Sequence, residues 1–170
     1  MDFIELAKAR YSCRKLSDRA VEREKLEKIL DAAQAAPTAH NNQPYRIWII
    51  ESEDAKKKLA QINTYTFGAP LFMVVGGSKE EGWVREYDGE NFAAVDATIV
   101  ATHMMLEIHA LGLGTTWVGR FDAPKMKELF PQMEGYELVA IFPIGYPRED
   151  AHPAHLHSER KERGEIAESL

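Results

Sequence analysis

Residues 91–121, NFAAVDATIVATHMMLEIHALGLGTTWVGRF, decide the fold of this chain. Apolar side chains between Phe92 and Leu111 fall around most of the circumference of a helix rather than along one stripe. A helix with this pattern is buried on more than one side, either by the rest of the chain or by a second copy of it. Gly112 follows and predicts the end of the helix, because glycine readily takes the left-handed conformation that terminates helices.

Outside this stretch, apolar periodicity and turn residues predict a mixture of helices and short strands. We expect helices near residues 2–9, 22–35, 53–62, 92–111 and 122–130. We expect strands near residues 45–50, 71–75 and 137–144. Residues 77–90 mix glycine with charged side chains and are typical of a surface segment. This succession predicts an α+β or α/β domain.

Length and composition are those of one globular domain over residues 1–170, since 45% of the residues are hydrophobic and 28% are charged. Residues 148–170 are charged and histidine-rich with few apolar side chains, so they form either a disordered tail or an arm that docks elsewhere. The net charge of -6 gives no electrostatic reason to expect nucleic acid as a partner.

The N-terminus and the cysteine content indicate a reducing compartment. Acidic residues stand where a secretory signal needs a basic start. No stretch reaches the roughly 20 consecutive apolar residues of a membrane span. Cys13, the only cysteine, excludes an internal disulfide and a multi-thiolate metal site, and we expect it to be a packed small residue. We therefore expect a soluble cytoplasmic protein with no membrane contact.

The glycines of the loop that follows the long helix do not form a dinucleotide fingerprint. That fingerprint needs its glycines after a strand and before a helix, whereas Gly112 and Gly114 follow a helix. Gly112 is explained by helix termination. Gly119, in an otherwise apolar run, indicates the close approach of a ligand to the backbone.

Residues 10–15 carry three cationic side chains and a hydroxyl within a short segment. Arg10, Ser12 and Arg14 would bind a phosphate well, because arginine offers a planar fork of donors and serine adds a hydrogen bond. The alternative is a solvated helix end, which is the commoner outcome for isolated arginines.

Residues 37–44 form a loop of side-chain amides between Pro37 and Pro44. Asn41, Asn42 and Gln43 offer donors and acceptors suited to the polar edge of a planar heterocycle. Ordinary turn chemistry is an equally good explanation, since asparagine and proline dominate loops.

Three histidines near the C-terminus, His152, His155 and His157, have a spacing that could bind a transition metal. A solvated arm is the better interpretation, and we predict no metal site.

Taken together and in order, these motifs resemble the FMN-dependent nitroreductase family. The resemblance rests on Arg-x-Ser-x-Arg at 10–14, Pro-Thr-Ala-x-Asn-x-Gln-Pro at 37–44, Ala-Pro at 69–70, Leu-Gly-Leu-Gly-Thr-x-Trp-Val-Gly at 111–119, Gly-Tyr-Pro at 145–147 and a basic pair at 160–161. It implies an α+β nitroreductase-like fold with a central, mostly antiparallel sheet flanked by helices. It also implies an intertwined homodimer with an FMN at each of two interface sites.

The same resemblance implies which residues hold FMN. The 10–14 segment and the basic pair would bind the phosphate and ribityl chain, with Arg14 also near the pyrimidine edge, where a cation stabilises negative charge on the ring. The amide loop, from the other subunit, and the 118–120 backbone would line the ring, with Asn63 at its edge. The full set is Arg10, Tyr11, Ser12, Arg14, Pro37, Thr38, Ala39, Asn41, Asn42, Gln43, Asn63, Val118, Gly119, Arg120, Arg160 and Lys161.

Two departures from the family pattern bear on the substrate. Arg120 stands where the family often has a second glycine, so its side chain is expected near the substrate side of the flavin. The chain is short for the family and lacks a long lid insertion between residues 77 and 90.

The implied activity is an FMN-dependent NAD(P)H oxidoreductase that reduces nitroaromatic, quinone or related small acceptors by ping-pong hydride transfer through flavin N5. NADH or NADPH would be the reductant, and no side chain is predicted as a general acid. The alternatives are a non-catalytic FMN-binding dimeric module and a specialised relative such as a flavin reductase, an ene-reductase or a dehalogenase.

Overall fold

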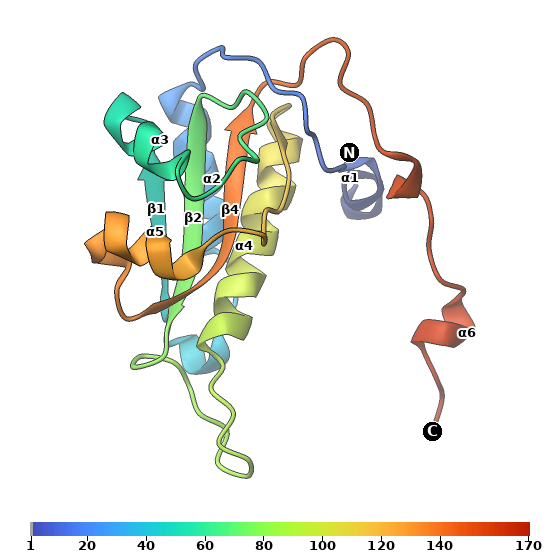
Figure 1. Ribbon diagram of the computed structural model, residues 1–170. Coiled ribbons are helices and arrows are strands. Elements are labelled where there is room, and N and C mark those ends of the chain that lie inside the picture. Colours follow the sequence, from blue (N-terminus) through green and yellow to red (C-terminus); the bar gives the residue numbers. More distant parts are fainter. Residues whose placement is uncertain (1) are drawn as a thin grey trace.

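A four-stranded antiparallel sheet forms the centre of the protein in the computed structural model, which describes residues 2–170 (Figure 1). The strands lie in the order β1 (Tyr45–Ile50), β2 (Leu71–Ser78), β4 (Tyr136–Gly145) and β3 (Gly114–Thr115). Every neighbouring pair is antiparallel. The α+β prediction, with an antiparallel central sheet flanked by helices, is confirmed.

Strand β2 is buried along its whole length because it lies between two strands and under helices on both faces. The predicted strand ended at residue 75, but β2 continues through Gly76 and Gly77. A Cβ atom on Gly77 would lie 2.2 Å from the carbonyl oxygen of Ala93, so only glycine lets the strand pass the start of the next helix.

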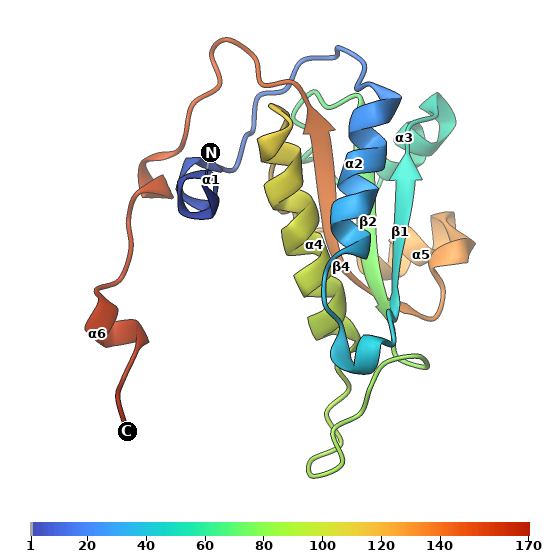
Figure 2. The ribbon, with the colours of Figure 1, turned by 180° about the vertical axis from the view of Figure 1, so that it is seen from behind.

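Helices α2 (Arg23–Gln34) and α4 (Ala93–Ala110) cover one face of the sheet, as Figure 2 shows. Helices α3 (Glu53–Leu59) and α5 (Ala123–Leu129) lie on the other face (Figure 1). Two apolar clusters fill the layers between helices and sheet. The sheet therefore has a hydrophobic core on each side.

Helix α3 ends three positions earlier than the sequence indicated. The N–H groups of Gln61 and Ile62 donate to Lys58 and Leu59 at 3.1 and 3.0 Å, which tightens the chain into a turn. The side chain of Ser52 caps the start of α3 by accepting from the Ala55 N–H. Asp122 caps α5 in the same way.

Helix α4 buries only one of its apolar faces within the chain. The buried residues are Ala93, Asp96, Ala97, Val100, Ala101, Met104 and Ile108. On the other side, Val95 is 42% exposed. Gly112 ends the helix with φ of +74°, which confirms the predicted left-handed cap.

Helix α1 (Phe3–Ala9) and the C-terminal segment lie to one side of the sheet and its covering helices (Figures 1 and 2). The segment from residue 148 is an extended arm that carries the short turns η3 (His155–His157) and α6 (Arg163–Ile166). Leu156 and Ile166 are exposed on it. Within residues 2–170, no helix is both long and apolar enough to cross a membrane.

Gly77→Ala is expected to lower the free energy of unfolding by about 1–3 kcal/mol, because the added methyl group overlaps the backbone of α4. Gly164→Ala is the matched control, since a Cβ there meets no atom within 4 Å. Denaturant unfolding of both variants measures the difference. Equal midpoints would contradict the close packing of β2 against α4.

Candidate functional site

The 10–14 segment follows α1 and is held against the sheet by backbone contacts of Ser12 and Cys13. Ser12 forms a bridge with Thr115, and the N–H of Cys13 donates to the carbonyl of Thr115 at 2.8 Å. Cys13 is 1% exposed, so its thiol packs inward, as expected of a small structural residue. Gly114 leaves room for it, since a Cβ there would lie 2.9 Å from the Cys13 sulfur. Arg10, Ser12 and Arg14 line the surface of the segment.

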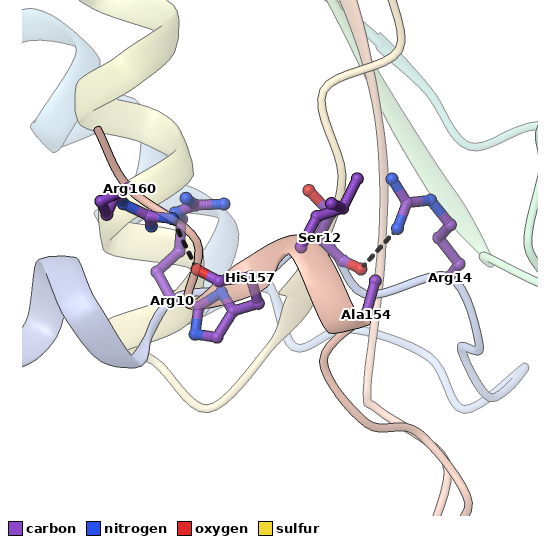
Figure 3. Close-up of a pocket in the computed structure, with 7 residues that line it drawn as sticks. Arg10, Ser12, Arg14, Ala154, His157 and Arg160 are labelled. Carbon is purple, nitrogen blue, oxygen red and sulfur yellow. Dashed lines mark hydrogen bonds between the residues drawn. The ribbon is translucent and has the colours of Figure 1, made fainter. Parts of the chain in front are cut away.

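A cavity of about 230 Å³ separates this segment from the C-terminal arm. Figure 3 shows the arm turning past the end of α1, with Arg160 beside Arg10. The lining residues are Arg10, Ser12, Arg14, Ala154, Leu156, His157 and Arg160. The structure thus brings together four of the residues predicted to bind phosphate. The other predicted basic residue, Lys161, is not among the lining residues.

We call this cavity the anion site, because its electrostatics suit an anion. None of its lining residues carries a carboxylate. Among residues 2–170, no ion pair forms to Arg10, Arg14 or Arg160. Burial, together with repulsion from the Arg160 cation, lowers the pKa of Arg10. A bound phosphate would supply the missing negative charge.

A second pocket, of about 180 Å³, shares Arg14 with the first. It is lined by Arg14, Tyr65, Phe67, Thr116, Trp117, Val118, Gly119 and Arg120. The three aromatic side chains and the glycine give it the character of a site for a flat ring. The anion site and the aromatic pocket therefore adjoin through one guanidinium.

The backbone at Gly119 is open toward this pocket. Val118 exchanges two hydrogen bonds of 3.0 Å with Ile141, which fixes the loop against β4. Within residues 2–170, the next two N–H groups, of Gly119 and Arg120, donate to no protein acceptor. A Cβ on Gly119 would meet nothing closer than 3.9 Å, so the glycine leaves room for a ligand beside free donors.

Arg120 and Asn63 are organised by Tyr65, which the sequence analysis did not single out. The Arg120 guanidinium donates to the Tyr65 hydroxyl at 3.3 Å. Asn63 is 2% exposed, and its side-chain oxygen accepts from the Tyr65 N–H at 2.9 Å. Asn63 therefore holds the loop from within, and its contact with a ring edge stays a prediction.

The amide loop is a preformed turn at the opposite end of α4. Thr38 accepts a hydrogen bond from the Gln43 N–H at 3.0 Å, and Asn42 donates to the carbonyl of Glu81 at 3.1 Å. His40, Asn41 and Gln43 all have positive φ angles, near +50°. These left-handed residues are strained, and strain of this kind is maintained by the surrounding contacts.

Asp96, in the first turn of α4, anchors the amide loop. Its Oδ1 accepts from the Ala39 N–H at 2.9 Å, and the residue is 1% exposed. Its other oxygen, Oδ2, is buried without a partner in the described residues. Asp96 and Glu107 are the two acids of this largely apolar helix, and apolar periodicity gives no reason to single out Asp96.

The two halves of the predicted site lie at opposite ends of α4. The Tyr11 ring is 6.4 Å from the ring of His109, near the C-terminal end of the helix, whereas Ala39 bonds to Asp96 near its N-terminal end. At about 1.5 Å per residue, these two positions are roughly 20 Å apart along the axis. One chain therefore does not bring the amide loop to the anion site.

The three C-terminal histidines do not gather around one point. Within residues 2–170, no group of three or more histidine, cysteine, aspartate or glutamate side chains is arranged to hold a metal ion. Only His157 lines the anion site.

Comparison with known proteins gives one family. Residues 7–67 and 62–146 match the model of the nitroreductase family. A solved nitroreductase family protein from Clostridium difficile 630 is 39% identical, with a TM-score of 0.91 over 99% of this chain and 98% of that one. A candidate NADH dehydrogenase/NAD(P)H nitroreductase of Methanothermobacter thermautotrophicus is 29% identical over 157 residues, 88% of this chain and 80% of that protein.

A third relative was solved with a ligand. This candidate nitroreductase from Exiguobacterium sibiricum 255-15, in complex with FMN, has a TM-score of 0.83 and 22% identity over 100% of this chain and 98% of that one. At this identity the likeness shows a shared fold.

Asp96→Ala is expected to free the amide loop, because the partly buried Ala39 N–H loses its acceptor at a cost of about 1–3 kcal/mol. Asp96→Asn keeps an oxygen at the same position and serves as the control. Amide hydrogen exchange at residues 39–43 measures how firmly the loop is held. Exchange should be faster than in wild type in the alanine variant alone. Equal exchange in both variants would show that Asp96 does not hold the loop.

Proposed function

Because the chain belongs to the nitroreductase family, we propose that it is an FMN-dependent NAD(P)H oxidoreductase. The observation that carries this proposal is the junction of an unpaired cationic cavity with an aromatic pocket that presents free backbone donors. A flavin mononucleotide has the matching parts, a phosphate at one end and a flat ring with polar edges at the other. The FMN bound to the Exiguobacterium relative supports the same choice.

The residues present fit FMN at both ends. Arg10, Ser12 and Arg160 would hold the phosphate in the cationic cavity. Arg14, which lines both pockets, would reach from the ribityl chain to the pyrimidine edge. The free N–H groups of Gly119 and Arg120 would meet acceptor atoms on the ring. Each cation of the cavity and each free backbone donor would then have a partner.

We propose that the active unit is a homodimer with two equivalent sites. The amide loop lies too far along α4 to reach a ring beside Gly119 of its own chain. In a two-fold dimer the same patch meets itself, so the N-terminal end of one α4 can approach the C-terminal end of its partner's. Each site would then combine the 10–14 and 117–120 segments of one chain with the amide loop of the other.

Two further features support this dimer. The outer side of α4 leaves Val95 42% exposed on an apolar helix, which is the kind of surface that a second copy covers. The C-terminal arm extends away from its own sheet and carries exposed Leu156 and Ile166, at 59% and 69% (Figure 2). An arm with apolar side chains and no core of its own is suited to packing on a partner.

The bound flavin would supply the redox chemistry, taking hydride at N5 from NADH or NADPH and passing it to the acceptor in a ping-pong sequence. The chain would position these reactants. Tyr65, Phe67 and Trp117 offer a flat apolar wall, which suits nitroaromatic, quinone and related small acceptors. The Arg120 guanidinium, held by Tyr65, lies where it can select among them.

The direct test is anaerobic mixing of FMN-loaded protein with NADH and with NADPH. We expect bleaching of the oxidised flavin absorbance by at least one of them, followed by reoxidation when a quinone or nitroaromatic is added. Parallel lines in double-reciprocal plots would confirm the ping-pong order. A flavin that stays oxidised with both nucleotides would instead identify a non-catalytic flavin-binding protein.

A further inference from the structure

Of the three histidines on the C-terminal arm, only His157 lines the anion site. It lies on the turn η3, faces the cavity beside Arg10 and Arg160, and is partly buried (Figure 3). Its backbone carbonyl accepts a hydrogen bond of 2.7 Å from the Arg160 guanidinium on the same arm. His155, two positions earlier on the same turn, is exposed and does not line the cavity.

Aromatic packing holds the imidazole in this position. The ring of Tyr11 lies edge-on to His157 at 6.4 Å and 75°, and edge-on to His109 of α4 at 6.4 Å and 78°. Burial, followed by the nearby Cys13, raises the pKa of Tyr11 to about 12, so the phenol between the two imidazoles stays neutral. Tyr11 therefore positions His157 without supplying a counter-charge.

The groups that face His157 are cationic or neutral. Arg10 and Tyr11 face it from the end of α1, His109 from α4, Arg14 from the segment before the sheet, and Arg160 from the arm. Burial, with added repulsion from Arg10 and His157, lowers the pKa of His109, so this second imidazole stays neutral at neutral pH. A positive charge on His157 thus has no partner in the lining of the cavity.

We propose that His157 is a ligand of the FMN phosphate and binds it in the imidazolium form, so that FMN is held less tightly as the pH rises above neutrality. This inference rests on the proposed function, because the anion is the phosphate of the flavin. A phosphate dianion favours the charged imidazole, since it forms a charge-assisted hydrogen bond with it. Three arginines provide a fixed positive charge, and His157 adds one that depends on pH.

The direction of the pH effect follows from proton linkage. Because the phosphate favours the charged imidazole, its binding draws a proton onto the ring, and the complex would hold more protons than its separated parts. Affinity for FMN then falls as the pH rises. Below about pH 6 the phosphate itself takes up a proton, so the informative range runs from about pH 6.5 to about pH 8.5.

The test measures dissociation constants of FMN and of riboflavin, which lacks the phosphate, for the apo full-length protein. Wild type, His157→Gln and His155→Gln are titrated by flavin fluorescence between about pH 6.5 and about pH 8.5. At the low end of this range, His157→Gln should weaken FMN binding by about tenfold. The variant should leave riboflavin binding unchanged, and the difference from wild type should shrink as the pH rises. His155→Gln should behave as wild type does with both flavins.

Three results would overturn the inference. An FMN dissociation constant that His157→Gln leaves unchanged would remove the residue from the phosphate site while the FMN assignment stands. An equal loss for riboflavin would show that the imidazole acts on the ring or on the fold. Failure of the wild-type protein to bind either flavin would contradict the proposed function itself, and this inference with it.

Discussion

Helix α4 fixes the distance between the anion site and the amide loop, the two parts of the proposed flavin site. Its buried face packs on the sheet through residues such as Val100 and Met104, both 0% exposed, so the helix is a rigid spacer. The C-terminal end of α4 lies near the anion site, and the N-terminal end holds the amide loop by a hydrogen bond. In the proposed dimer a second copy would complete the site, and this would explain why α4 is apolar on the side that its own chain leaves open.

The unpaired cations of the anion site have a related consequence. Arg10 is partly buried and lies close to Arg160, so an empty site holds like charges together at a cost in free energy. A phosphate removes that repulsion and bridges the arm to the 10–14 segment. The arm is anchored at its start by the ion pair of 2.9 Å between Lys15 and Asp150. Ligand binding would therefore stabilise the arm as well as the fold.

Local signals allowed much of this architecture to be predicted from the sequence. The strands and the glycine at the end of α4 each depend on residues close together in the chain. The contacts of Tyr65 with Arg120 and of Asp96 with Ala39 join segments 55 and 57 positions apart. Such contacts depend on the path of the chain, which periodicity and motif order do not describe. The family resemblance pointed to the site residues, but it gave no reason to notice Asp96 or His157.

The division of one site between two chains is tested most directly by mixing two defective variants. The first variant combines Arg10→Ala with Arg14→Ala and so removes two cations from the anion site. The second, Ala39→Trp, places an indole where the flavin ring would lie beside the amide loop. Each variant should form folded dimers that lose FMN. A mixed dimer, isolated with two affinity tags, should regain about one FMN, half the wild-type content, because one of its sites receives both intact halves. A mixed dimer as empty as its two parents would contradict the shared site.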